Sequence, residues 1–327
     1  MLLKGLNILL FLGGLLLAFV LAEVAVRMFV PVRMVGSSFT IYDPIYGKRL
    51  KRNYTTTRIT PEFTISFSTN SYAFRGPEGF PDRPILFLGD SFTMGYGVSD
   101  GEEFPALVRA ALAEHDPVIP VVNTGMGANG NGRWIKFLRA EGEAYEPRAV
   151  VLQLMSNDFQ DNKNERLFEL TPNQKLIELP VPSIRPIRVL QNVVDSIPGL
   201  ADSHLLGLIY QIYLTQGPQN SSLLSNSDAI DSLSDHSDQL TYRILDEVIA
   251  ICSAAGWPML AIVVGIHGER LTEIERRLKD NDIPMLRTPD RQVRPDLYYV
   301  TDGHWNQFGH ALVAEAVLAE LRILGIP

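Results

Sequence analysis

The residues whose types and spacing best suit a catalytic role are Gly89-Asp90-Ser91, which follow an apolar run at Ile85–Leu88. In an α/β protein this position lies just past the carboxyl end of a strand, where ligands commonly bind. Turns favour glycine, aspartate and serine on their own account. Ser91 is therefore either a turn residue that caps the next helix or a nucleophile presented to a substrate, and the rest of the sequence has to decide between the two.

A second chemically active pair lies near the carboxyl terminus, where Asp302 and His304 are two residues apart. In an extended segment, residues i and i+2 point the same way, which predicts that the carboxylate lies beside the imidazole. A carboxylate on one ring nitrogen fixes the tautomer and leaves the other nitrogen free to accept a proton from a hydroxyl. A turn without a catalytic role is the alternative interpretation. If Ser91 meets His304 in the fold, the three residues form a catalytic triad, for which chain order is immaterial.

Two further segments offer hydrogen-bond donors for an oxyanion. The Gly127-Ala128 turn exposes backbone N–H groups with little side-chain obstruction, and Asn157 carries a neutral side-chain amide. One donor aimed at a developing oxyanion is worth about 3–4 kcal/mol. In that case one edge of one sheet would carry the nucleophile, the small-residue turn, the side-chain amide and the Asp/His base.

The elements that must position these residues alternate between strand and helix. Strands are predicted at Ile85–Leu88, 118–122, 149–154, 259–264 and 284–286. The first helix is predicted after a capping-box-like start at 100–103, with Pro105 in its first turn and its buried face at Leu107, Val108, Ala111 and Leu112. Further helices are predicted at about 132–145, 240–255 and 271–280, with a last helix at the carboxyl terminus. Such alternation gives right-handed crossovers and a parallel sheet. The first three strands end in small and polar residues, so their ends project onto the same edge. We expect a three-layer α/β/α domain with a mostly parallel, flavodoxin-like sheet over residues 82–327.

The amino terminus is apolar over a length that can cross a bilayer. Gly5 to Ala22 is apolar except for Asn7, and a weaker apolar run continues to Val30. A run of about 18 or more such residues forms one membrane-spanning helix. A cleaved signal peptide is the alternative, since Lys4 supplies a charged start and Val20-Leu21-Ala22 is similar to a cleavage site. The apolar continuation favours an uncleaved anchor over residues 1–30.

Two segments fall outside the alternating pattern. Residues 31–81 are rich in Tyr, Thr, Ser, Arg and Pro, and the alternation at 63–68 predicts a half-exposed strand, so we expect a small β-rich lead-in near the membrane. Within it, Asn70–Gly76 has a structured composition but suggests no task. Residues 160–239 form an insertion with a short apolar helix at 205–214 and a polar, loop-like tract at 217–238. An insertion of this length at the ligand edge is commonly a lid or a binding flap.

The amino-acid composition limits the kinds of molecule and metal ion that the protein can bind. The chain is 46% hydrophobic and 20% charged, as in an ordinary globular protein. Its net charge of −8 argues against a nucleic-acid partner, because phosphate contacts need clustered Lys and Arg. The single cysteine, Cys252, excludes an intramolecular disulfide and a zinc site built from several cysteines. No metal or other cofactor is expected.

Taken together, four stretches resemble the conserved blocks of the SGNH (GDSL-type) hydrolase superfamily. They are Gly89-Asp90-Ser91, Asn123-Thr124-Gly125 onward, Ser156-Asn157-Asp158 and Asp302-Gly303-His304. The resemblance covers roughly residues 83–327. It implies that Ser91 is the nucleophile, His304 the base and Asp302 the residue that orients it. The implied oxyanion hole is the Ser91 N–H, an N–H of the second block and the Asn157 side chain.

Two positions depart from the pattern of the superfamily. Its second block usually has glycine as the oxyanion donor, but ungapped alignment from Asn123 places Ala128 there, so Ala128, Gly127 or Gly130 is the candidate donor. Its last block is usually Asp-x-x-His, whereas this chain has Asp-x-His. The shorter version resembles membrane-associated and periplasmic SGNH-like proteins that O-acetylate exported polysaccharides.

We therefore expect a membrane-anchored serine esterase that cleaves acyl esters, in particular O-acetyl esters, of a carbohydrate or a lipid. An O-acyltransferase acting on an exported polysaccharide is one alternative, and a non-catalytic, membrane-tethered glycan-binding scaffold is another. Glycan substrates of such enzymes lie outside the cytoplasm. The catalytic domain is accordingly predicted on the periplasmic side or at the cell surface.

Overall fold

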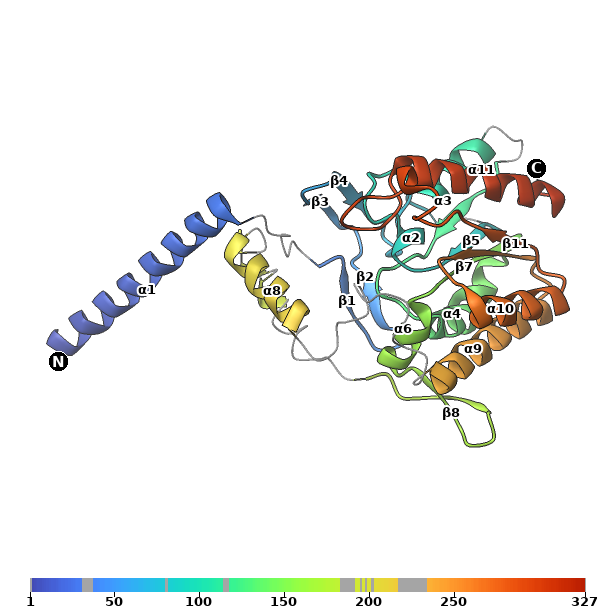
Figure 1. Cartoon of the computed structure of the whole chain (residues 1–327), viewed down its shortest axis with the longest axis horizontal. Coiled ribbons are helices and arrows are strands. Elements are labelled where there is room, and N and C mark those ends of the chain that lie inside the picture. Colours follow the sequence, from blue (N-terminus) through green and yellow to red (C-terminus); the bar gives the residue numbers. More distant parts are fainter. Residues whose placement is uncertain are drawn as a thin grey trace. The chain divides into compact units, whose positions relative to one another are not determined.

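The computed structural model describes residues 2–30, 38–79, 82–113, 118–182, 192–194, 196–197, 199–200, 203–216 and 234–326. Two compact units share the chain (Figure 1). The larger consists of Phe39–Arg58, Glu62–Ile184 and Asn226–Pro327, and the smaller of Met1–Ser38, Ile59–Pro61 and Arg185–Ser225. The lead-in that precedes residue 82 thus belongs almost entirely to the unit that contains the sheet.

A five-stranded parallel sheet forms the centre of the larger unit. Its strands are β5 (Ile85–Leu88), β6 (Val121–Asn123), β7 (Ala149–Met155), β10 (Met259–Val264) and β11 (Met285–Arg287). They lie in the order β11-β10-β7-β5-β6, and each neighbouring pair is parallel. Numbered along the chain this is 2-1-3-4-5, the flavodoxin-like order. The predicted fold class is confirmed.

Helices cover both faces of the sheet (Figure 1). Ile85 and Phe87 face α3 (Phe104–Leu112) and α11 (Gln307–Ile323) in one core cluster. Leu86 and Leu88 belong to a second cluster with α4 (Gly132–Phe137), α9 (Ser234–Ala254) and α10 (Gly268–Asp280). Successive side chains of a strand point to opposite faces, so an unbroken apolar strand such as β5 needs a helical layer on each side.

Some element boundaries differ from those predicted. The helix expected over 132–145 is interrupted after α4 by a π turn at Leu138–Gly142, followed by α5 (Glu143–Tyr145). A π turn inserts an extra residue into a helix and shifts its register. The short α2 (Ser91–Met94) follows β5, and a 3₁₀ turn at Pro295–Leu297 precedes α11. Of the polar tract expected at 217–238, residues 217–233 lie outside the described residues, and α9 begins at Ser234.

The lead-in forms two small pairs of strands, the antiparallel pair β1 (Thr40–Asp43) with β2 (Gly47–Leu50) and the pair β3 (Thr55–Ile59) with β4 (Thr64–Ser68). Asp43 closes the first hairpin, because its carboxylate accepts hydrogen bonds from the N–H groups of Ile45 and Tyr46, both at 2.8 Å. Further on, an antiparallel bridge from Arg75 to Asn123 joins the lead-in to β6. The lead-in is therefore attached to the main sheet close to the second block.

The predicted insertion divides between the two units. Its first part stays with the sheet as α6 (Asp158–Glu165) and a hairpin of β8 (Phe168–Leu170) and β9 (Leu176–Glu178). Within the smaller unit, α8 (His204–Gln216) contacts α1 (Leu2–Phe29). The Glu23 carboxylate of α1 accepts hydrogen bonds from the first two N–H groups of α8, each at 2.9 Å, and from Ser203 Oγ at 2.7 Å. The part of the insertion described at 203–216 is thus a partner of the apolar amino-terminal helix within the smaller unit.

Candidate active site

Ser91 is the first residue of α2, immediately after β5. The carboxylate of Asp90 caps this helix by accepting a hydrogen bond from Phe92 N–H at 2.9 Å. Gly95 ends the helix in the left-handed conformation, with φ of 80°. A side chain at residue 95 would collide with Glu103 Cβ at 2.4 Å, so both conformation and space require glycine. Because Ser91 is the first helical residue, its N–H has no intrahelical acceptor and is available to a ligand.

Ser91, His304 and Asp302 lie together although 213 residues separate the serine from the histidine. His304 Nε2 is 2.7 Å from Ser91 Oγ, and His304 Nδ1 is hydrogen-bonded to Asp302 Oδ1. The Asp302 side chain is only 5% exposed and that of His304 22%. This arrangement lets the imidazole take the hydroxyl proton while the carboxylate holds its tautomer.

The Asp302-Gly303-His304 segment is a tight turn and not the extended segment assumed from the sequence. Tyr299 N–H donates to His304 O at 2.9 Å, and Gly303 N–H donates to Tyr299 O at 3.2 Å. Gly303 has φ of 84°, which only glycine adopts without strain. The turn brings the carboxylate beside the imidazole by reversing the chain.

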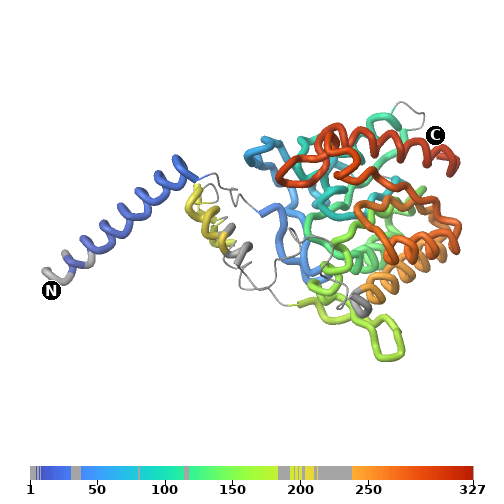
Figure 2. The backbone as a smooth tube through the Cα atoms, in the orientation of Figure 1, coloured from blue at the N-terminus to red at the C-terminus, as the bar shows by residue number. Residues whose placement is uncertain are grey.

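Glu62, from the lead-in, fixes this turn from outside. Its carboxylate accepts hydrogen bonds from Thr301 N–H at 2.8 and 2.9 Å and from Asp302 N–H at 2.6 Å. Figure 2 shows the red carboxyl-terminal segment beside the blue lead-in at this point. The imidazole itself lies against Phe92 and Tyr96, with ring centroids 4.8 and 5.0 Å away. The backbone of the turn and the imidazole ring of His304 are thus held by different side chains.

The second-block turn passes directly beside the nucleophile. A Cβ on Gly127 would lie 3.5 Å from Ser91 Cβ. Asn123 anchors the start of the turn, because its side chain donates to Thr93 O and accepts from Gly125 N–H, both at 2.9 Å. Ala128 has φ of 50°, a left-handed conformation that costs a non-glycine residue about 1–2 kcal/mol. Glycine adopts the same conformation without this cost.

Asn157 is the middle residue of the third block and lies just before α6. Its Nδ2 donates to Asp161 Oδ2 at 2.9 Å. The same amide lies close enough to the Asp90 carboxyl to lower its pKa, against the larger effect of burial. Asp158 holds the same turn, because its Oδ2 accepts from Met155 N–H at 2.8 Å and from Asn131 Nδ2 at 3.0 Å. The three candidate donor segments follow the carboxyl ends of β5, β6 and β7, which are neighbouring parallel strands of the sheet.

Carboxyl groups behind the site have raised pKa values. Burial raises the pKa of Asp90 above its ordinary value. Burial and the neighbouring Asp90 charge raise the pKa of Asp158 well above its ordinary value. Burial and repulsion from Glu165 raise the pKa of Asp161 to about 6. A carboxyl beside a candidate oxyanion donor thus changes charge in an experimentally accessible pH range.

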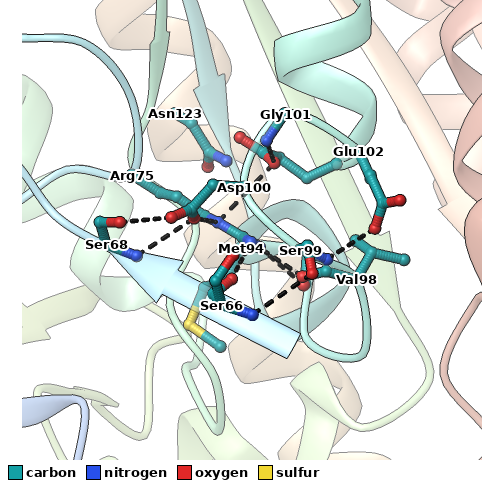
Figure 3. Close-up of polar contacts among 12 residues, drawn as sticks. Ser66, Ser68, Arg75, Met94, Val98, Ser99, Asp100, Gly101, Glu102 and Asn123 are labelled. Carbon is teal, nitrogen blue, oxygen red and sulfur yellow. Dashed lines mark hydrogen bonds and ion pairs between the residues drawn. The ribbon is translucent and has the colours of Figure 1, made fainter. Parts of the chain in front are cut away.

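The sequence did not reveal that three lead-in side chains hold the site. Besides Glu62, they are Lys48 on β2 and Arg75. Arg75 is 1% exposed and donates to Met94 O at 2.9 Å, Gly95 O at 2.7 Å and Val98 O at 2.8 Å, around the end of α2 (Figure 3). The only sequence signal was the structured composition of Asn70–Gly76, which did not specify a contact.

Among the described residues, no group of three or more His, Cys, Asp or Glu side chains has a metal-binding arrangement. His310 is fully buried in α11, and burial lowers the pKa of its imidazole to about 3. Its Nδ1 accepts a hydrogen bond from Phe104 N–H at 3.3 Å, so it serves as a neutral core residue.

The chain has only distant or partial similarity to the known proteins it was compared with. No family model matches the chain. An arylesterase from Vibrio mimicus is 30% identical over 74 residues, which cover 23% of this chain and 37% of the arylesterase. The chain therefore matches little more than a third of the length of this curated relative.

Solved structures with a related fold include esterases and a lipase/acylhydrolase, one of them described as an SGNH-hydrolase family esterase and another as a lipolytic protein of the G-D-S-L family. The psychrotrophic esterase EstA from Pseudoalteromonas sp. is 14% identical with a TM-score of 0.43, over 74% of this chain and 98% of EstA. A GDSL-family lipolytic protein from Desulfitobacterium hafniense is 12% identical with a TM-score of 0.39, over 72% of this chain and 97% of that protein. At these sequence identities and TM-scores the likeness concerns the fold, and the residues of the site are what bear on function.

Proposed function

We propose that the protein is an SGNH-type serine esterase that cleaves acyl esters through an acyl-serine intermediate. The observation that carries the proposal is the continuous hydrogen-bonded relay from Ser91 Oγ through His304 to Asp302. A turn without catalytic function has no need to place a serine, an imidazole and a nearly buried carboxylate in this order. The relay also counts against a non-catalytic glycan-binding scaffold.

The reaction begins with attack of Ser91 Oγ on the ester carbonyl carbon. His304 Nε2 takes the hydroxyl proton, and Asp302 stabilises the imidazolium that forms. The carbonyl oxygen becomes an oxyanion, for which the donors are the Ser91 N–H, a second-block N–H at Ala128 or Gly127, and the Asn157 amide. Collapse of this intermediate breaks the bond to the alcohol oxygen, which leaves with the proton from His304. Water, deprotonated by His304, then releases the acid and restores Ser91.

Replacement of Ser91 by Ala tests this assignment. The variant should lose turnover of p-nitrophenyl acetate by at least about 10³-fold, because the nucleophile is absent. Its melting temperature should stay close to that of the wild type. A fluorophosphonate probe should add to the wild type at Ser91, as located by mass spectrometry, and not to the variant. Turnover that survives in Ser91→Ala would show that another residue is the nucleophile.

For the substrate, we propose an O-acetyl ester of a carbohydrate or a lipid. The same acyl-serine would make the protein an O-acyltransferase if a sugar hydroxyl replaced water. The two-residue spacing of Asp302 and His304 is the feature that favours this second candidate, since it is the one that resembles polysaccharide O-acetylating proteins. Product analysis with an acetylated donor and a glycan acceptor separates the two. Free acetate alone indicates hydrolysis, and an acetylated acceptor indicates transfer.

We further propose that α1 is an uncleaved, single-pass membrane anchor and that the catalytic unit is extracytoplasmic. Residues Leu9–Phe29 of α1 form a 21-residue span with a mean hydropathy of 2.5, in which Glu23 and Arg27 are the charged residues, and only 6% of its apolar 18-residue window is buried within the protein. A helix this apolar and this exposed needs lipid around it in the absence of a protein partner. Alkaline extraction of membranes from the native host should leave the full-length chain in the pellet. Release into the supernatant as a shortened chain would indicate a cleaved signal peptide instead.

A further inference from the structure

Lys48 binds the second-block turn from the side of the lead-in. It lies on β2 and is only 9% exposed. Its ammonium group donates a hydrogen bond to Gly127 O at 2.7 Å and another to Ala128 O at 2.5 Å. Two carbonyls of consecutive residues therefore point at one cation. Charge-assisted hydrogen bonds of this kind are roughly twice as strong as those between neutral groups.

The position of these carbonyls determines the direction of two N–H groups. In a planar trans peptide the C=O and the N–H point in opposite directions. The carbonyl of Gly127 shares a peptide plane with the N–H of Ala128, and the carbonyl of Ala128 shares one with the N–H of Asn129. By holding both oxygens, Lys48 turns both N–H groups away from itself. One of them, at Ala128, is the candidate oxyanion donor.

The contact is reciprocal, so the hairpin and the turn fix each other. Arg133, at the start of α4, donates to Lys48 O at 2.7 Å and to Tyr46 O, and its Nε donates to Glu165 at 2.7 Å. The unfavourable left-handed conformation of Ala128 lies within this double attachment. Strained residues persist only where the surrounding structure holds them, and they gather at functional sites.

We propose that Lys48 is a positioning residue for the oxyanion hole, which it acts on through the carbonyls of Gly127 and Ala128. This inference rests on the proposed esterase function. Lys48 fixes the direction of the Ala128 N–H and, as a cation on the carbonyl side of the same peptide, polarises that N–H towards a negatively charged oxygen. It also gives the lead-in hairpin a function in catalysis.

The principal test compares Lys48→Met with the wild type. Methionine keeps most of the length and the apolar stem but removes the cation. Because the oxyanion exists only in the transition state and the tetrahedral intermediate, kcat should fall by about 10–100-fold with KM nearly unchanged. The affinity for methylboronic acid, which forms a tetrahedral anion on Ser91, should fall by a similar factor. A kcat and a boronate affinity both within 3-fold of the wild type would overturn the inference.

Lys136→Met is the matched control. Lys136 is equally buried, at 7%, and lies in α4 of the same unit, but its ammonium group pairs with Glu178. This variant should share any general loss of stability without the loss of kcat. If Lys48→Met does not fold, Lys48→Arg retains the cation and should keep most of the wild-type kcat. A kcat for Lys48→Arg that is about 10-fold or more below that of Lys136→Met, each relative to its folded fraction, would count against the inference.

Two further measurements separate positioning from a structural role. A cavity of about 60 Å³ adjoins Lys48 and is also lined by Asn129 and Trp134. In Lys48→Ala, added ethylammonium should enter the enlarged cavity and restore kcat in a saturable way, whereas the neutral ethanol should not. Equal effects of the two additives would contradict the proposed role of the charge.

Hydrogen exchange of the peptide that contains residues 127–129 does not depend on turnover. It should be at least about 10-fold faster in Lys48→Met than in Lys136→Met. If the wild type neither hydrolyses esters nor reacts with a fluorophosphonate, the esterase proposal fails. The exchange rate still decides whether Lys48 holds the turn, and an unchanged rate would refute that claim.

Discussion

Replacement of Arg75 by Met should destabilise the larger unit more than any other single change in the lead-in. Arg75 lies against two carboxylates, Asp100 with Nε–Oδ1 of 2.9 Å and Glu103 with Nε–Oε2 of 3.7 Å. Asp100 is 33% exposed and can be rehydrated, but Glu103 is 2% exposed and cannot. The carbonyls of Met94, Gly95 and Val98 also lose their donor.

The magnitude follows mainly from the carboxylate that remains. Loss of one partner of a buried ion pair costs about 3–5 kcal/mol, since an uncompensated charge is left behind. Carbonyls without a donor add about 1 kcal/mol if water replaces part of the lost bonding. The free energy of unfolding should therefore fall by about 4–6 kcal/mol. At about 2–4 °C per kcal/mol for a unit of this size, this lowers Tm by about 8–24 °C.

The pH dependence identifies the cause. Burial raises the pKa of Glu103 above its ordinary value, and Arg75 opposes that rise. Without Arg75 the pKa of Glu103 in the folded state rises further. The contribution of Glu103 to the unfolding free energy of the variant should therefore be lost as the pH rises through that pKa. The deficit relative to the wild type should be larger at pH 8 than at pH 5. In the double variant Arg75→Met/Glu103→Gln, about half of the deficit at pH 8 should be recovered.

Urea titrations at both pH values measure these differences. Arg139→Met is the control, because Arg139 pairs with Glu178 and Glu247 at 45% exposure and its loss should cost less than about 1 kcal/mol. The reasoning is wrong if Arg75→Met melts within 3 °C of Arg139→Met. It is also wrong if its deficit is the same at pH 5 and pH 8, since the buried Glu103 charge would then not be the main cost.

Three further perturbations have defined outcomes. Burial and Glu165 raise the pKa of Asp161 to about 6, because they make its ionised form unfavourable in the fold. The stability that protonated Asp161 contributes is complete below about pH 4 and is lost as the pH rises through 6. Asp161→Asn should accordingly increase the free energy of unfolding by about 1–3 kcal/mol at pH 8 and leave it unchanged at pH 4 in urea titrations, and equal effects at the two pH values would contradict the assignment. Ala128→Gly should relieve the left-handed strain and raise stability by up to about 1 kcal/mol with kcat retained, and a lower Tm would show that the strain is overestimated. Glu23→Gln in the full chain should weaken the cap on α8, and hydrogen exchange at residues 204–207 should accelerate while exchange in α11 stays the same.

Much of the fold was determined by local sequence patterns. Unbroken apolar runs such as Ile85–Leu88, separated by helical segments, specify a parallel sheet covered on both faces, because each strand must bury side chains in both directions. The small and polar residues after the strands identify the ligand edge by the same logic. Ser91, Asn157 and the Asp302–His304 pair were recognisable because their residue types and turn composition are encoded within a few positions.

The tertiary structure decided how these pieces are held. Whether Ser91 meets His304 depends on a contact across 213 residues, which no local pattern records. No local pattern assigns a contact to Glu62, Lys48 or Arg75, whose importance comes only from the carbonyls and N–H groups that the fold places opposite them. A left-handed alanine at residue 128 and the Glu23 cap on the helix at 204–216 are likewise properties of the packed chain. Local periodicity specifies which residues are buried, but a polar side chain acquires a role only when long-range packing supplies its partner.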